Sequence, residues 1–151
     1  MMLRRLVEQQ GLVLPQAPTP VGNYAAAQLA GGLLYISGQL PLRDEELIYQ
    51  GKLGRDLSVE QGQQAAELCA LNLLSQLDRY IANRQLESVV KLEGYINSSD
   101  SFVEHAKVLN GASDLLFKVL GASAGHTRIV IGCTSLPLNA PVEIAAVVAL
   151  Q

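Results

Sequence analysis

The sequence contains no tryptophan, and aromatic residues make up only 5% of its 151 positions. Charged residues are also scarce at 17%, whereas hydrophobic residues amount to 49%. Such a composition excludes intrinsic disorder, which requires low hydrophobicity and high charge. Because the apolar residues are mainly small aliphatics, we expect alanine- and valine-lined surfaces that another protein layer covers.

Positive charge and cysteine are in short supply as well. The formal net charge is −3 with a sequence pI near 5.3, and no basic stripe of the kind found in nucleic-acid binders is present. We therefore expect no nucleic-acid partner. The two cysteines, Cys69 and Cys133, have no metal-ligand spacing around them, which predicts a reduced, cytoplasmic protein without a metal site.

No long hydrophobic run is present. The longest apolar stretches are too short to span a bilayer. Near the N-terminus, Leu6-Val7 leads directly into Glu8-Gln9-Gln10, so the hydrophobic core of a signal peptide is missing. We expect a soluble protein without membrane contacts.

The local signals predict one α+β domain with two helices on one face of a mixed sheet. Ser58 and Gln61 form a potential capping box at the start of a long helix, and Gly31-Gly32 marks a hairpin turn. Gly38 and Pro41 are expected to end the second strand, and the Pro-rich residues 14–20 to be extended and exposed. The predicted strands are residues 24–30, 33–37, 46–49, 88–97, 127–134 and 142–150. The other predicted helices are residues 3–12 and 101–120, the latter ended by Gly121.

The strand at 88–97 is expected to point Val90, Leu92 and Ile96 to one side. The last strand is apolar on both of its sides, with Ile144 and Ala145 as examples. Two helices can cover only one side of such a sheet, and a monomer avoids leaving a large apolar patch open. The second side is therefore predicted to be a subunit interface.

Arg128 and Glu143 are predicted to lie on that second side among Val130, Ala145 and Val147. A buried charge without a partner costs several kcal/mol. Arg128 is therefore in a structural salt bridge, at an exposed rim, or ready to bind an anionic ligand. A carboxylate would suit the planar fork of its guanidinium. A tight hairpin between the last two strands would place Arg128 opposite Val147 and about 13 Å from Glu143. The two share a site only if the connection is wide or bulged, or if they come from different subunits.

Five segments together resemble the Rid/YjgF family. They are residues 20–24 (Pro-Val-Gly-Asn-Tyr), 34–41 (Leu-Tyr-Ile-Ser-Gly-Gln-Leu-Pro), 127–132 (Thr-Arg-Ile-Val-Ile-Gly), 136–137 (Leu-Pro) and 141–144 (Pro-Val-Glu-Ile). The resemblance divides the chain into an N-terminal extension, residues 1–16, and one domain, residues 17–151. It implies a chorismate-mutase-like fold and a homotrimer whose sheets close into a central barrel, with active sites between subunits.

The resemblance also implies an activity. Active family members hydrolyse enamines of the 2-aminoacrylate type, or their imine tautomers, to 2-oxo acids and ammonia without a cofactor. Carried over, Arg128 holds the substrate carboxylate and Glu143 positions and activates the water. The implied cleft residues are Tyr24, Ser37, Asn110 and the main chain of Gly38 and Val130. Two alternatives are a non-catalytic binder of small 2-oxo or amino acids and, with little support from an acidic chain, an endoribonuclease.

This chain departs from the family pattern in several places. It has Arg128-Ile129-Val130 where many members have Arg-Ser followed by Cys or Ala, and Gly-Asn-Tyr replaces Gly-Pro-Tyr. The extension and the longer loop at 43–57 indicate a longer-chain branch, and the natural substrate stays open. Of the two histidines, His105 is expected to be an ordinary helix side chain. His126, which directly precedes the Arg128 strand, either is an ordinary side chain or tunes the cleft.

Overall fold

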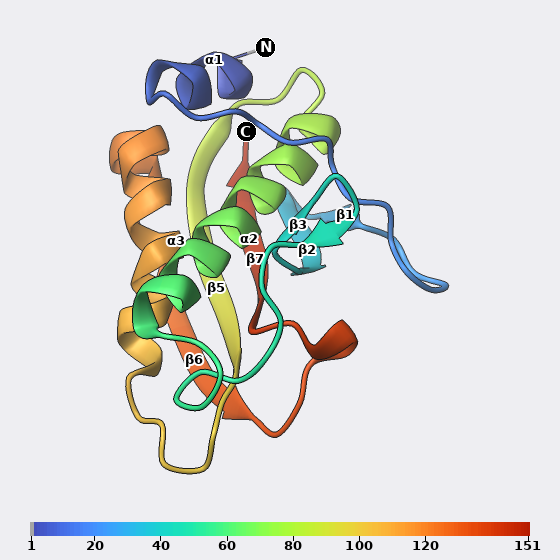
Figure 1. The fold of residues 1–151 in the computed structure, drawn as a ribbon. Helices are drawn as coiled ribbons and strands as arrows, with labels where there is room; N and C mark the ends of the chain where they lie inside the picture. The colour runs from blue at the N-terminus through green and yellow to red at the C-terminus, as the bar shows by residue number, and fades with distance from the viewer. Residues whose placement is uncertain (1) are drawn as a thin grey trace.

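A computed structural model describes residues 2–151, and its centre is a five-stranded sheet with two long helices on one face (Figure 1). In spatial order the strands are β1 (Ala27–Ala30), β2 (Leu33–Gln39), β7 (Val142–Leu150), β5 (Leu86–Asn97) and β6 (Thr127–Cys133). The covering helices are α2 (Val59–Tyr80) and α3 (His105–Leu120). All strand pairs are antiparallel except β5–β6. The predicted α+β class and the one-sided helical layer are confirmed.

The shorter elements lie around this centre. They are α1 (Met2–Gln9), β3 (Leu42–Arg43), β4 (Glu46–Leu47) and the 3-10 turns η1 (Gly121–Ala124) and η2 (Pro137–Asn139). Helix α1 buries Leu3 and Val7 and contacts both long helices. Whether the domain begins at residue 17 stays a prediction. Within residues 2–151, no helix is both long and apolar enough to cross a bilayer.

The capping box predicts the start of α2 correctly. The Ser58 hydroxyl accepts a hydrogen bond from the Gln61 N–H, and the Gln61 side chain accepts one from the Ser58 N–H. Helix α3, in contrast, begins at His105 rather than Ser101. The Phe102 N–H donates to the Ser99 carbonyl in a turn, which takes the first residues of the predicted helix out of it.

The Pro-rich segment is extended but not freely exposed, which corrects the prediction. Leu14 is buried. The Ser75 hydroxyl donates to the Pro15 carbonyl, and the Gln76 amide donates to the Pro18 carbonyl at 2.8 Å. The segment is therefore fastened along α2, since these main-chain groups find partners on that helix.

Strand β5 carries a bulge that the alternation of its sequence does not reveal. Its register with β7 shifts between Val89 and Lys91, and Val89 is 3% exposed while Val90 is 37% exposed. The prediction that Val90 shares a face with Leu92 is wrong, because the extra residue at the bulge reverses the alternation.

Strands β6 and β7 do not form the hairpin considered from the sequence. Strand β5 lies between them, parallel to β6 and antiparallel to β7, and the connection runs through η2 (Figure 1). Arg128 is therefore in register with Leu92, and Leu92 with Ala146. Arg128 does not face Val147 at all.

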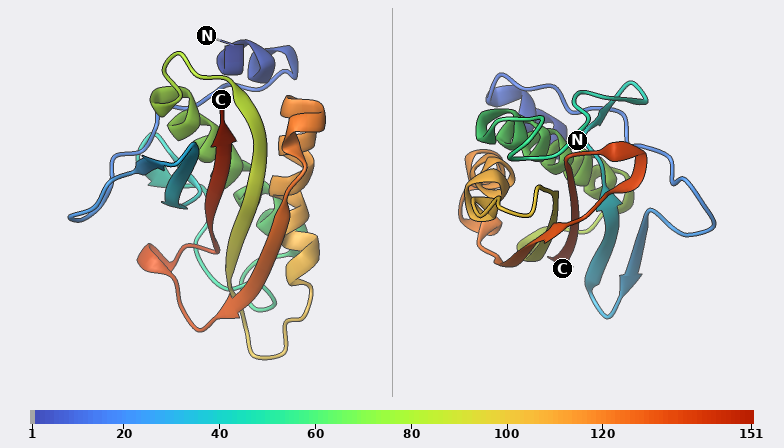
Figure 2. Two further views of the ribbon diagram at one scale, coloured as in Figure 1. Left: turned by 180° about the vertical axis from the view of Figure 1, so that it is seen from behind. Right: turned by 60° about the horizontal axis from the view of Figure 1, so that its bottom comes forward.

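The sheet face opposite the helices has no cover in the protomer (Figure 2). Tyr35, Ile129 and Ile131 lie on it with 48%, 53% and 46% of their surface exposed. Ala145 and Val147 between them are only half-buried. We call this surface the uncovered sheet face. It corresponds to the second apolar side expected from the sequence.

Candidate functional site

Three of the predicted site residues meet at one cleft of about 180 Å³ beside β2 and β7. Tyr24, Gly38 and Glu143 all line it. Its outer walls are residues 18–21 of the fastened Pro-rich segment and residues 137–138 of η2. The cleft thus brings together segments that are more than 100 positions apart in the sequence.

Glu143 supplies the only ionised side chain of this cleft among the described residues. It lies near the start of β7, on the side of the sheet away from the helices. Within residues 2–151, neither an ion pair nor a hydrogen bond engages its carboxylate. Burial raises the pKa of Glu143 above its ordinary value, which brings the carboxylate closer to the range where general bases work.

Gly38 makes room for this carboxylate. In the register of β2 with β7, Ile36 faces Ala146 and Gln39 faces Ile144, so Ser37 and Gly38 together oppose a single residue. This β-bulge extends β2 to Gln39, and the prediction that Gly38 ends the strand is wrong. A β-carbon on residue 38 would lie 2.5 Å from Glu143 Oε2, so a side chain at residue 38 and the present position of Glu143 exclude each other.

Ser37 adjoins the cleft without being one of its lining residues. Its hydroxyl donates to the Ala25 carbonyl at 2.7 Å, and its N–H donates to the Ala26 carbonyl at 2.9 Å. In the protomer Ser37 therefore fixes the segment that follows Tyr24. A direct contact of Ser37 with a ligand stays a prediction.

Arg128 lies on the other side of the sheet, at its β6 edge. The exposed Ile129 and Ile131 occupy the uncovered sheet face, so alternation turns Arg128 towards α3. Its Nη1 donates to Ser113 Oγ at 3.0 Å and its Nη2 to the Ala106 carbonyl at 3.4 Å. The prediction that Arg128 shares a face with Glu143 is wrong, since β5 rather than β7 adjoins β6.

Asn110 and Val130 lie near Arg128. Asn110 is one helical turn after Ala106 and one before Ser113, on the same face of α3. Val130 is in register with Gly94, where its side chain packs towards the helices. The guanidinium is half-buried, and among residues 2–151 no carboxylate pairs with it.

The two groups of residues are too far apart to hold one small ligand. Glu143 is in register with Tyr95 and Ile131, three positions along β6 from Arg128. Two strand spacings and three residues of rise separate their Cα atoms by about 14 Å, and the side chains leave opposite faces. A site that uses both residues must take them from two copies of the chain.

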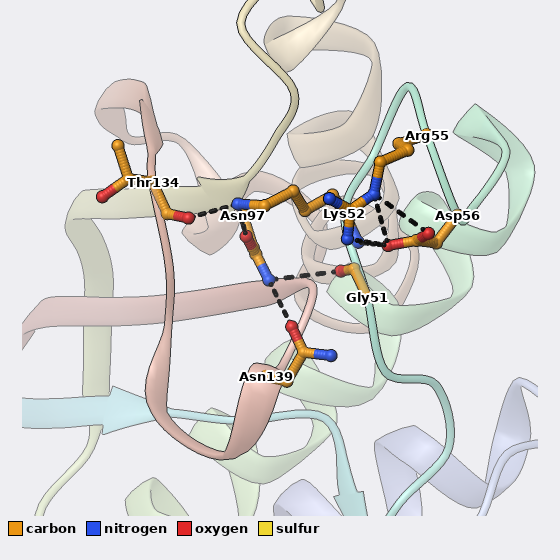
Figure 3. Close-up of polar contacts among 7 residues, drawn as sticks. All are labelled: Gly51, Lys52, Arg55, Asp56, Asn97, Thr134 and Asn139. Atoms are coloured by element: carbon orange, nitrogen blue, oxygen red, sulfur yellow. Dashed lines mark hydrogen bonds and ion pairs between the residues drawn. The ribbon is translucent and has the colours of Figure 1, made fainter.

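A polar network that the sequence did not predict connects the end of η2 to the loop at Gly51 and Lys52 (Figure 3). The fully buried Asn97 donates to the Gly51 carbonyl and to Asn139 Oδ1 at 3.1 Å. Lys52 Nζ donates to Asn97 Oδ1 at 2.9 Å and to the Thr134 carbonyl. The adjacent Leu138 has a left-handed φ of 59°, and its carbonyl accepts a hydrogen bond from the Gln50 side chain at 3.0 Å. No sequence signal pairs Lys52 with Asn97, since they lie on separate elements.

The remaining polar groups do not form a metal site in the part of the chain that the structure describes, where no cluster of three His, Cys, Asp or Glu side chains occurs. His105 packs edge-on against Phe102 with ring centroids 5.2 Å apart, as expected for an ordinary helix residue. His126 lies beside the Arg128 group.

Comparison with known proteins identifies the family of this chain. Residues 4–149 match the family described as "YjgF/chorismate mutase-like, putative endoribonuclease". The chain belongs to that family. Protein TCP17 of Trypanosoma cruzi is 41% identical over 96% of this chain and 92% of its own. A RutC family protein of Aquifex aeolicus is 35% identical over 88% and 93%.

Solved structures agree. A protein of unknown function from Agrobacterium tumefaciens, 39% identical, has a TM-score of 0.92 and covers 99% of this chain and 93% of its own. RidA from an Antarctic Psychrobacter, 25% identical, has a TM-score of 0.62 over 89% and 94%. The resemblance to the Rid/YjgF family and the chorismate-mutase-like fold are thereby confirmed, and a deaminase or related role is supported at the level of the family.

Proposed function

We propose that the protein is a hydrolytic deaminase that converts enamines or imines bearing a carboxylate into 2-oxo acids and ammonia. The observation that carries this proposal is the half-buried Arg128 guanidinium, which no carboxylate neutralises among residues 2–151. A guanidinium has five N–H groups. Two are used within the protomer, which leaves three for a carboxylate ligand.

Hydrolysis of an imine requires that substrate and water are correctly oriented more than that either is strongly activated. An enamine that takes up a proton on carbon becomes an imine, whose carbon is electrophilic. Water adds to this carbon, and the resulting carbinolamine expels ammonia to leave the carbonyl of the 2-oxo acid. Glu143 would accept a proton from the attacking water and return it to the departing nitrogen. Arg128 and Asn110 would hold the substrate at its carboxylate, with Tyr24, Ser37, Gly38 and Val130 around it.

The catalytic unit would be a homotrimer without a cofactor. The separation of Arg128 from Glu143 calls for a second copy, and the uncovered sheet face offers the surface on which copies would meet. In this arrangement the Arg128 edge of one protomer would adjoin the Glu143 cleft of its neighbour. A cytoplasmic location stays a prediction from the two free thiols, Cys69 and Cys133.

A coupled assay tests the proposal. A pyridoxal-phosphate dehydratase generates 2-aminoacrylate, and the release of the 2-oxo acid is followed with and without this protein. We expect the wild type to accelerate release and Arg128→Ala to abolish that acceleration. Arg55→Ala is the matched control, because Arg55 forms only an exposed ion pair with Asp56.

Two outcomes would contradict the proposal. One is equal acceleration by the wild type and Arg128→Ala. The other is no acceleration by the wild type, in which case calorimetric titration with pyruvate would distinguish a binding protein from one without affinity for 2-oxo acids. An RNA-cleaving activity would instead appear as salt-sensitive binding of single-stranded RNA.

A further inference from the structure

We infer that Ser113 and His126 are positioning residues that hold the Arg128 guanidinium in the orientation that receives the carboxylate. The inference deepens the proposed function and rests on it. It starts from a continuous chain of three side chains, which come from α3, from β6 and from the connection directly before β6. Arg128 Nη1 is 3.0 Å from Ser113 Oγ, and Ser113 Oγ is 2.9 Å from His126 Nε2.

With His126 neutral, the groups themselves set the direction of each hydrogen bond in this chain. A guanidinium only donates, so Ser113 Oγ accepts from Arg128. His126 Nδ1 faces the Ala124 carbonyl, which only accepts, so Nδ1 carries a proton. The Ser113 hydroxyl hydrogen is then free to donate to an unprotonated Nε2. The chain therefore runs from Arg128 through Ser113 and His126 to the Ala124 carbonyl.

The His126 end of the chain is held by packing as well as by hydrogen bonds. Ala124 is fully buried, and Ser113 is 7% exposed. Phe117, one turn after Ser113 on α3, lies against the His126 ring with centroids 5.7 Å apart. Fixed at both nitrogens and on one face, the imidazole determines where the Ser113 lone pair points, and this determines the plane of the guanidinium.

These hydrogen bonds fix Arg128 and still leave its charge and its remaining N–H groups available to a ligand. A salt bridge to a carboxylate would fix Arg128 equally well and would also neutralise it. A neutral hydroxyl fixes the guanidinium and leaves its charge and three N–H groups for the ligand. Loss of the chain should release the guanidinium, so that binding the carboxylate then includes ordering the side chain.

Substrate kinetics test this positioning role through KM. Interactions that serve substrate and transition state alike change KM and leave kcat nearly constant. We expect Ser113→Ala and His126→Asn to raise KM about fivefold, as for one lost hydrogen bond. Ser113→Thr keeps the hydroxyl and His126→Gln keeps an acceptor where Nε2 lies, so both should stay near the wild-type KM. Thr127→Val is the control, since its hydroxyl bonds to Val90 and not to Arg128.

The tautomer of His126 is measured on the wild type itself, and a variant serves only to assign the signals. The chain has only two histidines, so ¹⁵N NMR of the wild type and of His126→Asn assigns both rings. We expect His126 in the Nδ1–H tautomer. A proton on Nε2 with none on Nδ1, or an unchanged KM in Ser113→Ala and His126→Asn, would overturn the inference.

The outcomes separate this inference from the proposed function. Acceleration by the wild type with no change of KM in the variants removes the positioning role and leaves the deaminase. If the wild type gives no acceleration, the deaminase fails. The positioning role is then decided by pyruvate titration, in which a weaker affinity of Ser113→Ala than of Thr127→Val supports it and equal affinities overturn it.

Discussion

The Glu143 carboxylate lies against Gly38, at the point where a β-carbon on residue 38 would come within 2.5 Å of Oε2. The glycine in the β2 bulge therefore provides the space that the Glu143 carboxylate on β7 occupies. This arrangement places a carboxylate of raised pKa in a cleft and beside main-chain groups that a bulge frees from regular pairing.

Gly38→Ala should displace Glu143 and lower activity about tenfold or more, because small misplacements of a catalytic group are costly. Unfolding free energy should change little, because the atoms in the way belong to the end of the flexible Glu143 side chain, which can move aside. Gly125→Ala is the control, since its nearest neighbour would be 3.7 Å away. Turnover and chemical denaturation measure both effects. Wild-type activity in Gly38→Ala would contradict the assigned geometry.

Glu143→Gln should lower turnover about a hundredfold, as for removal of a general base. In the wild type, turnover should decline as pH falls through the pKa of Glu143, and the midpoint should lie above the ordinary value for glutamate because burial raises that pKa. The pH profile of kcat measures this. A midpoint at or below the ordinary value would contradict the role of burial.

The same shift has an opposite consequence for stability. A carboxyl whose folded pKa is raised stabilises the fold fully below its unfolded pKa, and this contribution is lost as pH rises through the folded pKa. Glu143→Gln, which stays neutral, should therefore gain unfolding free energy relative to the wild type at neutral pH. The difference should vanish in acid. Denaturation curves at neutral and at acid pH measure both differences. A wild type that is more stable than Glu143→Gln at neutral pH would contradict the prediction.

Asn97→Ala should destabilise the protein by about 2 kcal/mol, because Lys52 and the Gly51 carbonyl lose a buried partner. KM should rise as well, since Asn97 bonds to Asn139 (Figure 3), which adjoins the cleft residues Pro137 and Leu138. Asn83→Ala, at an exposed position, is the control for both measurements. An Asn97→Ala protein with wild-type melting temperature and KM would show that the network is dispensable.

Ile131→Glu should dissociate the proposed trimer, because it places a charge on the uncovered sheet face. Light scattering after size exclusion should give a trimer for the wild type and a monomer for the variant, which should also be inactive. Val103→Glu is the control at an exposed loop position away from this face. A monomeric and active wild type would contradict the subunit arrangement.

Local chemistry determined how much of this fold could be predicted from the sequence. Ser58 and Gln61 predict the start of α2 because both partners of the capping box lie within one turn. Alternation correctly separates Arg128 from Ile129 and Ile131. Which of these faces meets the helices depends on strand order, and the insertion of β5 between β6 and β7 is a long-range choice without a local signal.

The site was predictable to a smaller extent. The family resemblance pointed to Gly38 and Glu143, which the structure brings together in one cleft, and to Arg128, which lies at another edge of the sheet. Their roles stay predictions. The bulge at Val90 and the network of Lys52 and Asn97 join distant elements. No spacing in the sequence reports them, because they depend on tertiary packing.

The central claim is that Arg128 of one copy and Glu143 of another complete one active site. Co-expression of Arg128→Ala and Glu143→Gln chains under separate tags, with purification through both, yields mixed oligomers. If each of the three sites of a trimer takes one residue from each of two neighbours, one site of every mixed trimer keeps both residues. About a third of the wild-type activity should then return, although each parent is inactive alone. Mixed oligomers as inactive as their parents would contradict the shared site.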